Sequence, residues 1–392
     1  MPNINTPRCP FETVPEEESN QINETAELTV KLLDKRYTEK NAKILRGVHP
    51  KSHGCVKATF EINSDIASDL QVGLFAYPGS KYDAIVRFSN AATLVSPDID
   101  DKGRHGSRGM AIKVLNIDGE MLLNDNGEHN QDFLMINQPA FAFANTPDYL
   151  RLNRILYKNN DQPDEFFTPL GLQDPRTPEE QKQKILEYIA QENLSEEDIK
   201  RIFETFNIVK GIQASGVANP IEVQYFGAAP FLFGSDRVMK FSVKPRNLHG
   251  ISDIPTTPSD NYLEEALTNT LKSEQTIIFD FMVQIRTPNE GNLEIENSSA
   301  LWSEANFPFI NIAMLSITAP QTEIDTLQNK QHCEKLEFTP WHSLKAHQPI
   351  GSINRLRQSV YQASAEHRNK EQGTKSFKQV LLGFKRCILG HK

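Results

Sequence analysis

Six short segments of alternating, β-branched or aromatic residues constrain the fold of this 392-residue chain more than any other feature. Turn-forming residues separate them, and each has the length and composition of a single strand. This pattern predicts a mainly antiparallel sheet or barrel. The segments are CVKATFEI, AIVRFSN, RGMAIKVLNI, DFLMI, RVMKFSVKP and TIIFDFMVQI.

Helical periodicity surrounds and interrupts these strands, at residues 21–45, 177–206, 260–272 and about 350–392. The predicted fold class is therefore α+β, a β-rich core with inserted and C-terminal helices. We expect an N-terminal arm and helix at residues 1–40. One domain should follow at 41–372, with a helical insertion near 177–206. Residues 373–392 are predicted to form a C-terminal amphipathic helix.

Composition excludes several classes of function. The net charge of −9 argues against nucleic acid as a partner, because phosphate binding needs a basic face. The acidic N-terminus has no apolar core, and no run of 18 apolar residues occurs, so neither a secretory signal nor a membrane span is predicted. We expect a reducing, cytoplasmic compartment. The cysteines are scattered without a CxxC pair, so no disulfide framework or zinc knuckle is predicted; they are Cys9, Cys55, Cys333 and Cys387.

The C-terminal stretch SFKQVLLGFKRCILGHK leaves two alternatives open. It places apolar residues on one helical stripe, flanked by lysines and an arginine. A basic amphipathic helix can lie on an anionic membrane surface. It can equally pack as a terminal helix on the barrel. The apolar stripe consists of Phe377, Val380, Leu381, Phe384 and Ile388.

The segment RLRQSVYQASAEHR, residues 355–368, places Arg357, Tyr361 and Arg368 on one face of a predicted helix. An arginine one turn from a phenol favours the ionised form of the phenol. A tyrosinate can be the axial ligand of ferric haem, and a second arginine further along could bind a haem propionate. A surface helix with a partly buried tyrosine would show the same pattern.

Three other segments supply groups that a peroxide-handling haem needs: a base, a neutral hydrogen-bonding group and apolar walls. Taken singly, the histidine could be a loop residue and the asparagine could serve a turn. ILRGVHPKSHG supplies Arg46, Val48 and His49. YDAIVRFSN supplies Arg87 and Ser89, and DFLMINQPAFAF supplies Asn137, Phe141 and Phe143.

Five segments in this order resemble the haem catalases: RGVH, VRFS, RGMAIKV, INQP and RQSVYQASAEHR. The resemblance covers roughly residues 40–370. It implies an antiparallel eight-stranded β-barrel, a haem b cofactor and cleavage of the O–O bond of hydrogen peroxide or an organic peroxide. A homo-oligomer, a nicotinamide nucleotide and the natural peroxide are left open.

The resemblance also implies roles for individual residues. His49 resembles the acid–base histidine above the iron, Asn137 the asparagine that orients peroxide, and Ser89 the serine bonded to the other histidine nitrogen. Tyr361 resembles the iron ligand, with Arg357 as its partner. The remaining residues assigned to the cofactor pocket are Arg46, Val48, Arg87, Phe143 and Arg368.

Several departures keep a second function open. The chain is short for a catalase and resembles a smaller catalase-related branch, some of whose members rearrange fatty-acid hydroperoxides. The coral allene oxide synthase domain has a threonine before its distal histidine, where this chain has Val48. Ile136 stands where the first asparagine of the family's N-N-T-P motif would be, and residues 119–130 look like an added loop. A haem-binding module without turnover and a barrel without haem are the remaining alternatives.

Overall fold

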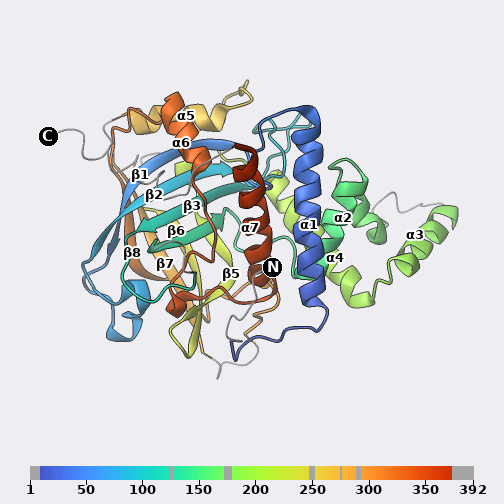
Figure 1. The fold of residues 1–392 in the computed structure, drawn as a ribbon, viewed down its shortest axis with the longest axis horizontal. Helices are drawn as coiled ribbons and strands as arrows, with labels where there is room; N and C mark the ends of the chain where they lie inside the picture. The colour runs from blue at the N-terminus through green and yellow to red at the C-terminus, as the bar shows by residue number, and fades with distance from the viewer. Residues whose placement is uncertain are drawn as a thin grey trace.

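The computed structural model describes residues 9–123, 128–171, 179–246, 252–273, 276–287 and 293–372. Its centre is a closed barrel of eight antiparallel strands in sequence order, with the last strand pairing with the first (Figure 1). The predicted eight-stranded barrel is thereby confirmed. The strands are β1 (Ser52–Ile62), β2 (Lys81–Asn90), β3 (Arg108–Leu115), β4 (Asn130–Ile136), β5 (Tyr225–Phe233), β6 (Arg237–Pro245), β7 (Ile277–Arg286) and β8 (Ile310–Ile317).

Because side chains alternate between the two faces of each strand, aromatic rings lie inside the barrel. Phe60, Phe133, Phe241 and Phe281 are fully buried or nearly so, and their rings contact one another at the centre of the barrel. The Phe133 and Phe281 ring centroids lie 4.7 Å apart. Because successive side chains of a strand point to opposite faces, the residues between these positions face outward. That outer face is where the candidate site is built.

Helices cover one side of the barrel (Figure 1). Two of them, α1 and α7, pack against each other, and α2 packs against α1. No residue of α3 is buried, and this helix extends away from the barrel. The helices are α1 (Glu18–Arg36), α2 (Thr146–Lys158), α3 (Glu179–Gln191), α4 (Glu196–Ala214), α5 (Tyr262–Lys272), α6 (Leu327–Lys335) and α7 (Ser352–Gln372).

The structure refines the predicted elements. The six predicted strands correspond to β1–β4, β6 and β7, whereas β5 and β8 were not predicted. In β5, the sequence YFGAAPFLF contains a glycine and a proline that weaken its strand signal. The helical insertion is two helices, because Ser195 and Asp198 form a capping box that begins α4. The predicted terminal helix at 373–392 lies outside the described residues.

A disulfide joins Cys55 of β1 to Cys333 of α6, a pairing that the sequence analysis did not predict. The two residues are 278 positions apart, and their Cα atoms lie 5.8 Å from each other. Nothing in the spacing of the cysteines could show this pairing, because the barrel alone brings β1 and α6 together.

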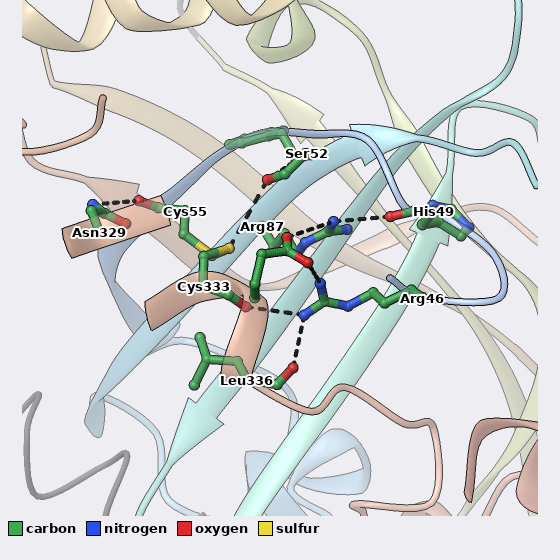
Figure 2. The surroundings of a disulfide bond; sticks show 10 residues. Arg46, His49, Ser52, Cys55, Arg87, Asn329, Cys333 and Leu336 are labelled. Atoms are coloured by element: carbon green, nitrogen blue, oxygen red, sulfur yellow. Dashed lines mark hydrogen bonds and ion pairs between the residues drawn. A yellow bond between two sulfur atoms is a disulfide. The ribbon is translucent and has the colours of Figure 1, made fainter. Parts of the chain in front are cut away.

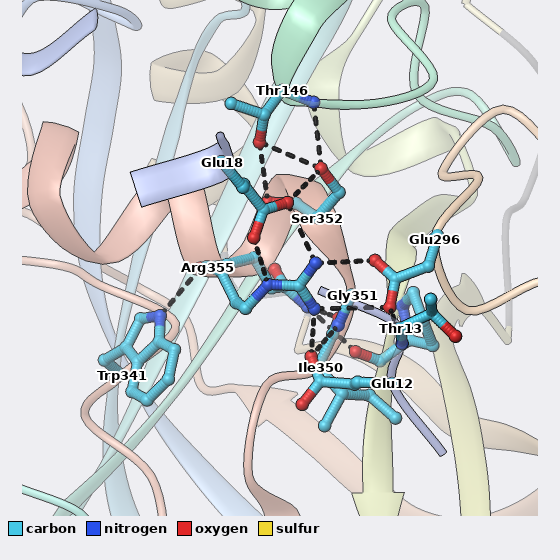
Figure 3. Close-up of polar contacts among 12 residues, drawn as sticks. Glu12, Thr13, Glu18, Thr146, Glu296, Trp341, Ile350, Gly351, Ser352 and Arg355 are labelled. Atoms are coloured by element: carbon cyan, nitrogen blue, oxygen red, sulfur yellow. Dashed lines mark hydrogen bonds and ion pairs between the residues drawn. The ribbon is translucent and has the colours of Figure 1, made fainter. Parts of the chain in front are cut away.

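A partly buried arginine connects the start of α7 to the N-terminal segment (Figure 3). Arg355 donates hydrogen bonds to Glu18 at 2.6 and 2.9 Å, to Glu296 at 2.7 Å, and also to Glu12. Burial raises the pKa of the Glu12 carboxyl, although Arg355 and the Gly351 amide oppose this effect. Three carboxylates from distant segments thus converge on one guanidinium and hold α7 in place.

Candidate active site

A cavity of about 810 Å³ is lined by the outer face of the barrel together with α1, α2 and α7. On the strands, the outward positions contribute Arg87 and Ser89 of β2, Ala111 of β3, and Leu134 and Ile136 of β4. Tyr361 and its neighbours on α7 also line the cavity. The volume lies in the range typical of sites for drug-sized ligands and cofactors.

His49 is held firmly at the cavity wall. Its backbone lies in the left-handed region at φ 58°, which is uncommon for a residue other than glycine and recurs at functional sites. The His49 amide donates to the Ala92 carbonyl at 2.8 Å, and its carbonyl accepts from Arg87 Nη2 at 2.9 Å. These two bonds fix the backbone from which the imidazole projects.

The His49 imidazole is neutral at physiological pH. Burial lowers its pKa to about 3, and the positive charges of Arg87, Arg357 and Arg46 act in the same direction. Its Nδ1 lies 3.0 Å from Ser89 Oγ. If Nδ1 carries the proton and donates to Ser89, Nε2 keeps a lone pair and can act as a base.

Gly109 of β3 makes room for this pair. A Cβ atom at this position would lie 2.4 Å from His49 Nδ1 and 2.9 Å from Ser89 Oγ. The ring therefore packs on bare backbone. Gly109 lies in the segment RGMAIKV, but no role could be assigned to it from the sequence. Only the tertiary contact with His49 shows why a side chain is excluded here.

Helix α7 brings Arg357 and Tyr361 together, as their spacing in the sequence predicted. Arg357 Nη2 donates to Tyr361 Oη at 3.1 Å. Arg357 Nη1 donates to the Asn354 side-chain oxygen at 3.1 Å, and Asn354 Nδ2 donates to the Pro230 carbonyl at 2.8 Å. Pro230 lies in an irregular stretch of β5, so this buried asparagine links the barrel to the arginine that faces the phenol.

Three arginines gather at one end of the cavity. Arg46 donates to Glu334 at 2.7 Å and to the carbonyls of Cys333 and Leu336 at 3.0 and 2.8 Å (Figure 2). Arg87 lies 3.6 Å from the same glutamate. Burial would raise the pKa of Glu334, but the charges of Arg46, Arg87 and Arg368 outweigh it, so this pKa lies below its usual value. Glu334 was not predicted as a site residue.

Arg368 is the third arginine and is only 4% exposed. Among the described residues it has no ion pair within 4 Å, and its Nε is buried without a hydrogen-bond acceptor, as is Arg87 Nε. A buried cation without a partner is costly. This end of the cavity therefore suits an anionic ligand with carboxylate groups.

Asn137 is not brought into the cavity wall. Its side-chain oxygen accepts hydrogen bonds from the Arg108 amide at 2.7 Å and from Ser107 Oγ at 3.0 Å. Ile136 lines the cavity instead. Because Ile136 shares the outward face with Leu134, the next residue points elsewhere. Strand alternation was the signal that could have located Ile136 at this wall.

An aromatic wall completes the cavity. Phe143 lines it together with Phe141 and Tyr149 of α2. The Tyr149 ring centroid lies 5.7 Å from that of Phe143 in an edge-to-face contact. Burial raises the pKa of Tyr149 to about 12, and Tyr361 adds to this effect, so its phenol stays protonated. Asn145 caps α2 and a proline stands in its first turn, so the sequence did signal this helix; it was not predicted, and Tyr149 was missed for that reason.

The eight-stranded barrel and its surrounding helices define a catalase-like fold. The structure is similar to a bacterial catalase (TM-score 0.57, 16% identity), a fungal catalase (0.58, 14%) and catalase A from Saccharomyces cerevisiae (0.58, 15%). These similarities cover 94%, 93% and 93% of this chain, which in turn spans 64%, 66% and 68% of the length of those catalases. The chain therefore has the catalase fold.

Sequence comparison adds no closer relationship. Neither a scan of protein-family models nor a search of curated proteins finds a match. In the part of the chain that the structure describes, no helix has both the length and the apolar character needed to cross a bilayer.

Proposed function

We propose that this protein is a haem-dependent hydroperoxidase that cleaves the O–O bond of hydrogen peroxide or an organic peroxide. One observation carries the proposal: a single cavity on the catalase fold is lined by both the His49–Ser89 pair and the Arg357–Tyr361 pair. These pairs lie more than 260 residues apart in the sequence. A base and a phenol therefore line the same cavity, and a haem-dependent hydroperoxidase would need both.

The residues present fit haem b as the cofactor. Tyr361 would hold the iron, because it lines the cavity and its phenol oxygen accepts a hydrogen bond from Arg357. Arg46, Arg87 and Arg368 would bind the two carboxylates, which agrees with the buried guanidinium nitrogens that lack acceptors. Val48 and Phe143 would form apolar walls.

When bound, the iron porphyrin supplies the electrons for O–O cleavage, whereas the chain supplies binding, orientation and proton transfer. The His49 Nε2 atom takes the proton of the hydroperoxide oxygen and returns it to the oxygen that leaves. The low pKa of His49 keeps the imidazole unprotonated before this transfer. Ser89 holds the ring in the required tautomer through Nδ1.

A second candidate function is the rearrangement of fatty-acid hydroperoxides, and the cavity wall favours it at one position. Ile136 presents an alkyl group where an amide would hold hydrogen peroxide, and Leu134 and Phe141 extend the apolar lining. An apolar wall suits an organic peroxide better than a small polar one. Val48, an apolar residue beside His49, favours the first function.

The absorption spectrum of the purified or haemin-reconstituted protein tests the proposal first. We expect a Soret band that Tyr361→Phe abolishes or shifts, while Tyr157→Phe, a change at an exposed tyrosine of α2, leaves it intact. A chain that remains colourless after reconstitution would refute the assignment.

A peroxide panel then separates the two functions. Oxygen release from hydrogen peroxide indicates the first, and loss of a conjugated-diene hydroperoxide without oxygen release indicates the second. His49→Ala should keep haem and lose O–O cleavage in either case, whereas His129→Ala, at an exposed position, should have no effect. Full activity of His49→Ala would contradict the proposed mechanism.

A further inference from the structure

The Cys55–Cys333 disulfide lies beside the arginines proposed to bind the haem carboxylates (Figure 2). Cys333 is the only buried residue of α6, a helix of nine residues. On the other side of the bond, Cys55 belongs to β1, a strand paired along its length within the barrel. The bond therefore connects a rigid element to a short surface helix.

The segment that begins with α6 contacts the arginines directly. Arg46 donates to the Cys333 and Leu336 carbonyls and to the Glu334 carboxylate, and Arg87 is ion-paired to that carboxylate. The residues that follow, Glu337 and Phe338, line the cavity. Movement of α6 would thus remove acceptors from Arg46 and open the wall at the end of the cavity where the arginines lie.

Apart from the disulfide, polar contacts hold α6, and the ion pairs of Glu334 with Arg46 and Arg87 are the most buried of them. Asn329 Nδ2 donates to the Cys55 carbonyl at 3.2 Å, and Lys330 forms an exposed ion pair with Glu264. Exposed ion pairs contribute little to stability. Leu336, just after the helix, is fully buried. It would stay packed on the barrel when α6 moves away. The disulfide is the covalent link between α6 and the barrel.

We propose that Cys55–Cys333 is a thiol–disulfide exchange site that controls how firmly the protein retains its cofactor. The oxidised bond keeps α6 over the arginine end of the cavity, and its reduction lets α6 lift. A dithiol reductant supplies two electrons and two protons, the S–S bond becomes two thiols, and the reductant leaves as a cyclic disulfide. This inference rests on the proposed haem function for its consequence, but not for the movement of α6.

Both sulfurs are buried, with Cys55 4% and Cys333 2% exposed. Exchange therefore requires a transient opening of α6, which short surface helices with few buried contacts undergo readily. Reduction then makes this opening more frequent, since the covalent link no longer opposes it. Cofactor release should follow the same opening.

Haem transfer from the loaded full-length protein to excess apomyoglobin tests the proposal. Dithiothreitol should raise the transfer rate about tenfold, with the thiols verified by alkylation and mass spectrometry. The double variant Cys55→Ser/Cys333→Ser should release haem at the fast rate with or without the reductant. Cys9→Ser, a change at a buried cysteine outside the disulfide, should respond as the natural protein does.

Equal transfer rates in the oxidised and reduced proteins would overturn the proposal, as would a double variant that still responds to the reductant. Hydrogen exchange of the amides of residues 327–336 distinguishes failure of the proposed haem function from failure of the proposed movement of α6. Faster exchange on reduction in a protein that binds no haem would support the movement of α6 and refute the haem function. Unchanged exchange in a haem-binding protein would refute the movement of α6 alone.

Discussion

Replacement of Gly109 by alanine should disable the site while leaving the barrel intact. The added Cβ atom would lie 2.4 Å from His49 Nδ1, 2.5 Å from His49 Cε1 and 2.9 Å from Ser89 Oγ. Close-packed interiors do not tolerate such contacts, so the imidazole would have to move by about 1 Å. Its backbone cannot retreat, because hydrogen bonds to Ala92 and Arg87 hold it on both sides.

The size of the effect follows from this displacement. A misplacement of about 1 Å in a catalytic group can lower the rate about 100-fold. The His49–Ser89 hydrogen bond would also be lost, at a cost of about 1 kcal/mol in the free energy of unfolding. We therefore expect Gly109→Ala to reduce kcat/KM for peroxide about 100-fold with only a small loss of stability.

The assay compares peroxide turnover, haem content and denaturation midpoint for Gly109→Ala and Gly106→Ala. Gly106 is a matched control three residues earlier, where an added Cβ would meet only Arg108 Nη1 at 3.7 Å, an ordinary contact. Its activity should match that of the natural protein. A Gly109→Ala protein with haem bound and more than half of the natural activity would show that His49 is not the base, or that its position is not critical.

Three further predictions follow from buried groups. Asn354→Leu removes the acceptor that positions Arg357 and leaves a buried donor unpaired, so haem affinity in a spectroscopic titration should fall about tenfold. Unchanged affinity would argue that Asn354 does not position Arg357 from the barrel. Arg355→Met should lower the free energy of unfolding by about 3 kcal/mol in urea, because it leaves buried carboxylates such as Glu18 uncompensated; a loss below about 1 kcal/mol would contradict this account. Burial lowers the pKa of His347 to about 4, below its unfolded value of about 6.5, so the unfolded chain binds the proton first. Its contribution to stability is therefore lost as the pH falls from 6.5 towards 4, with a slope of up to about 1.4 kcal/mol per pH unit. His347→Gln should flatten that slope in denaturation curves at pH 7, 6 and 5, and an unchanged slope would exclude His347 as its source.

Local geometry explains what could be predicted from the sequence. Arg357 and Tyr361 are one helical turn apart, and any helix over this segment brings them together. Six strands were predicted because period-two alternation is a property of the strand itself. The site residues were assigned from the catalase resemblance, which rests on short segments that occur in the same order as in that family.

The tertiary structure decided the features that depend on strand register and barrel closure. Ser89 meets His49 because β2 and the loop before β1 are neighbours, and the Cys55–Cys333 bond closes over 278 residues. Asn137 follows β4 and bonds the Arg108 amide and Ser107, whereas Ile136 at the end of the strand lines the cavity. Spacing along the chain determines local neighbours, whereas contacts between distant segments arise only once hydrogen bonding between strands has set their register.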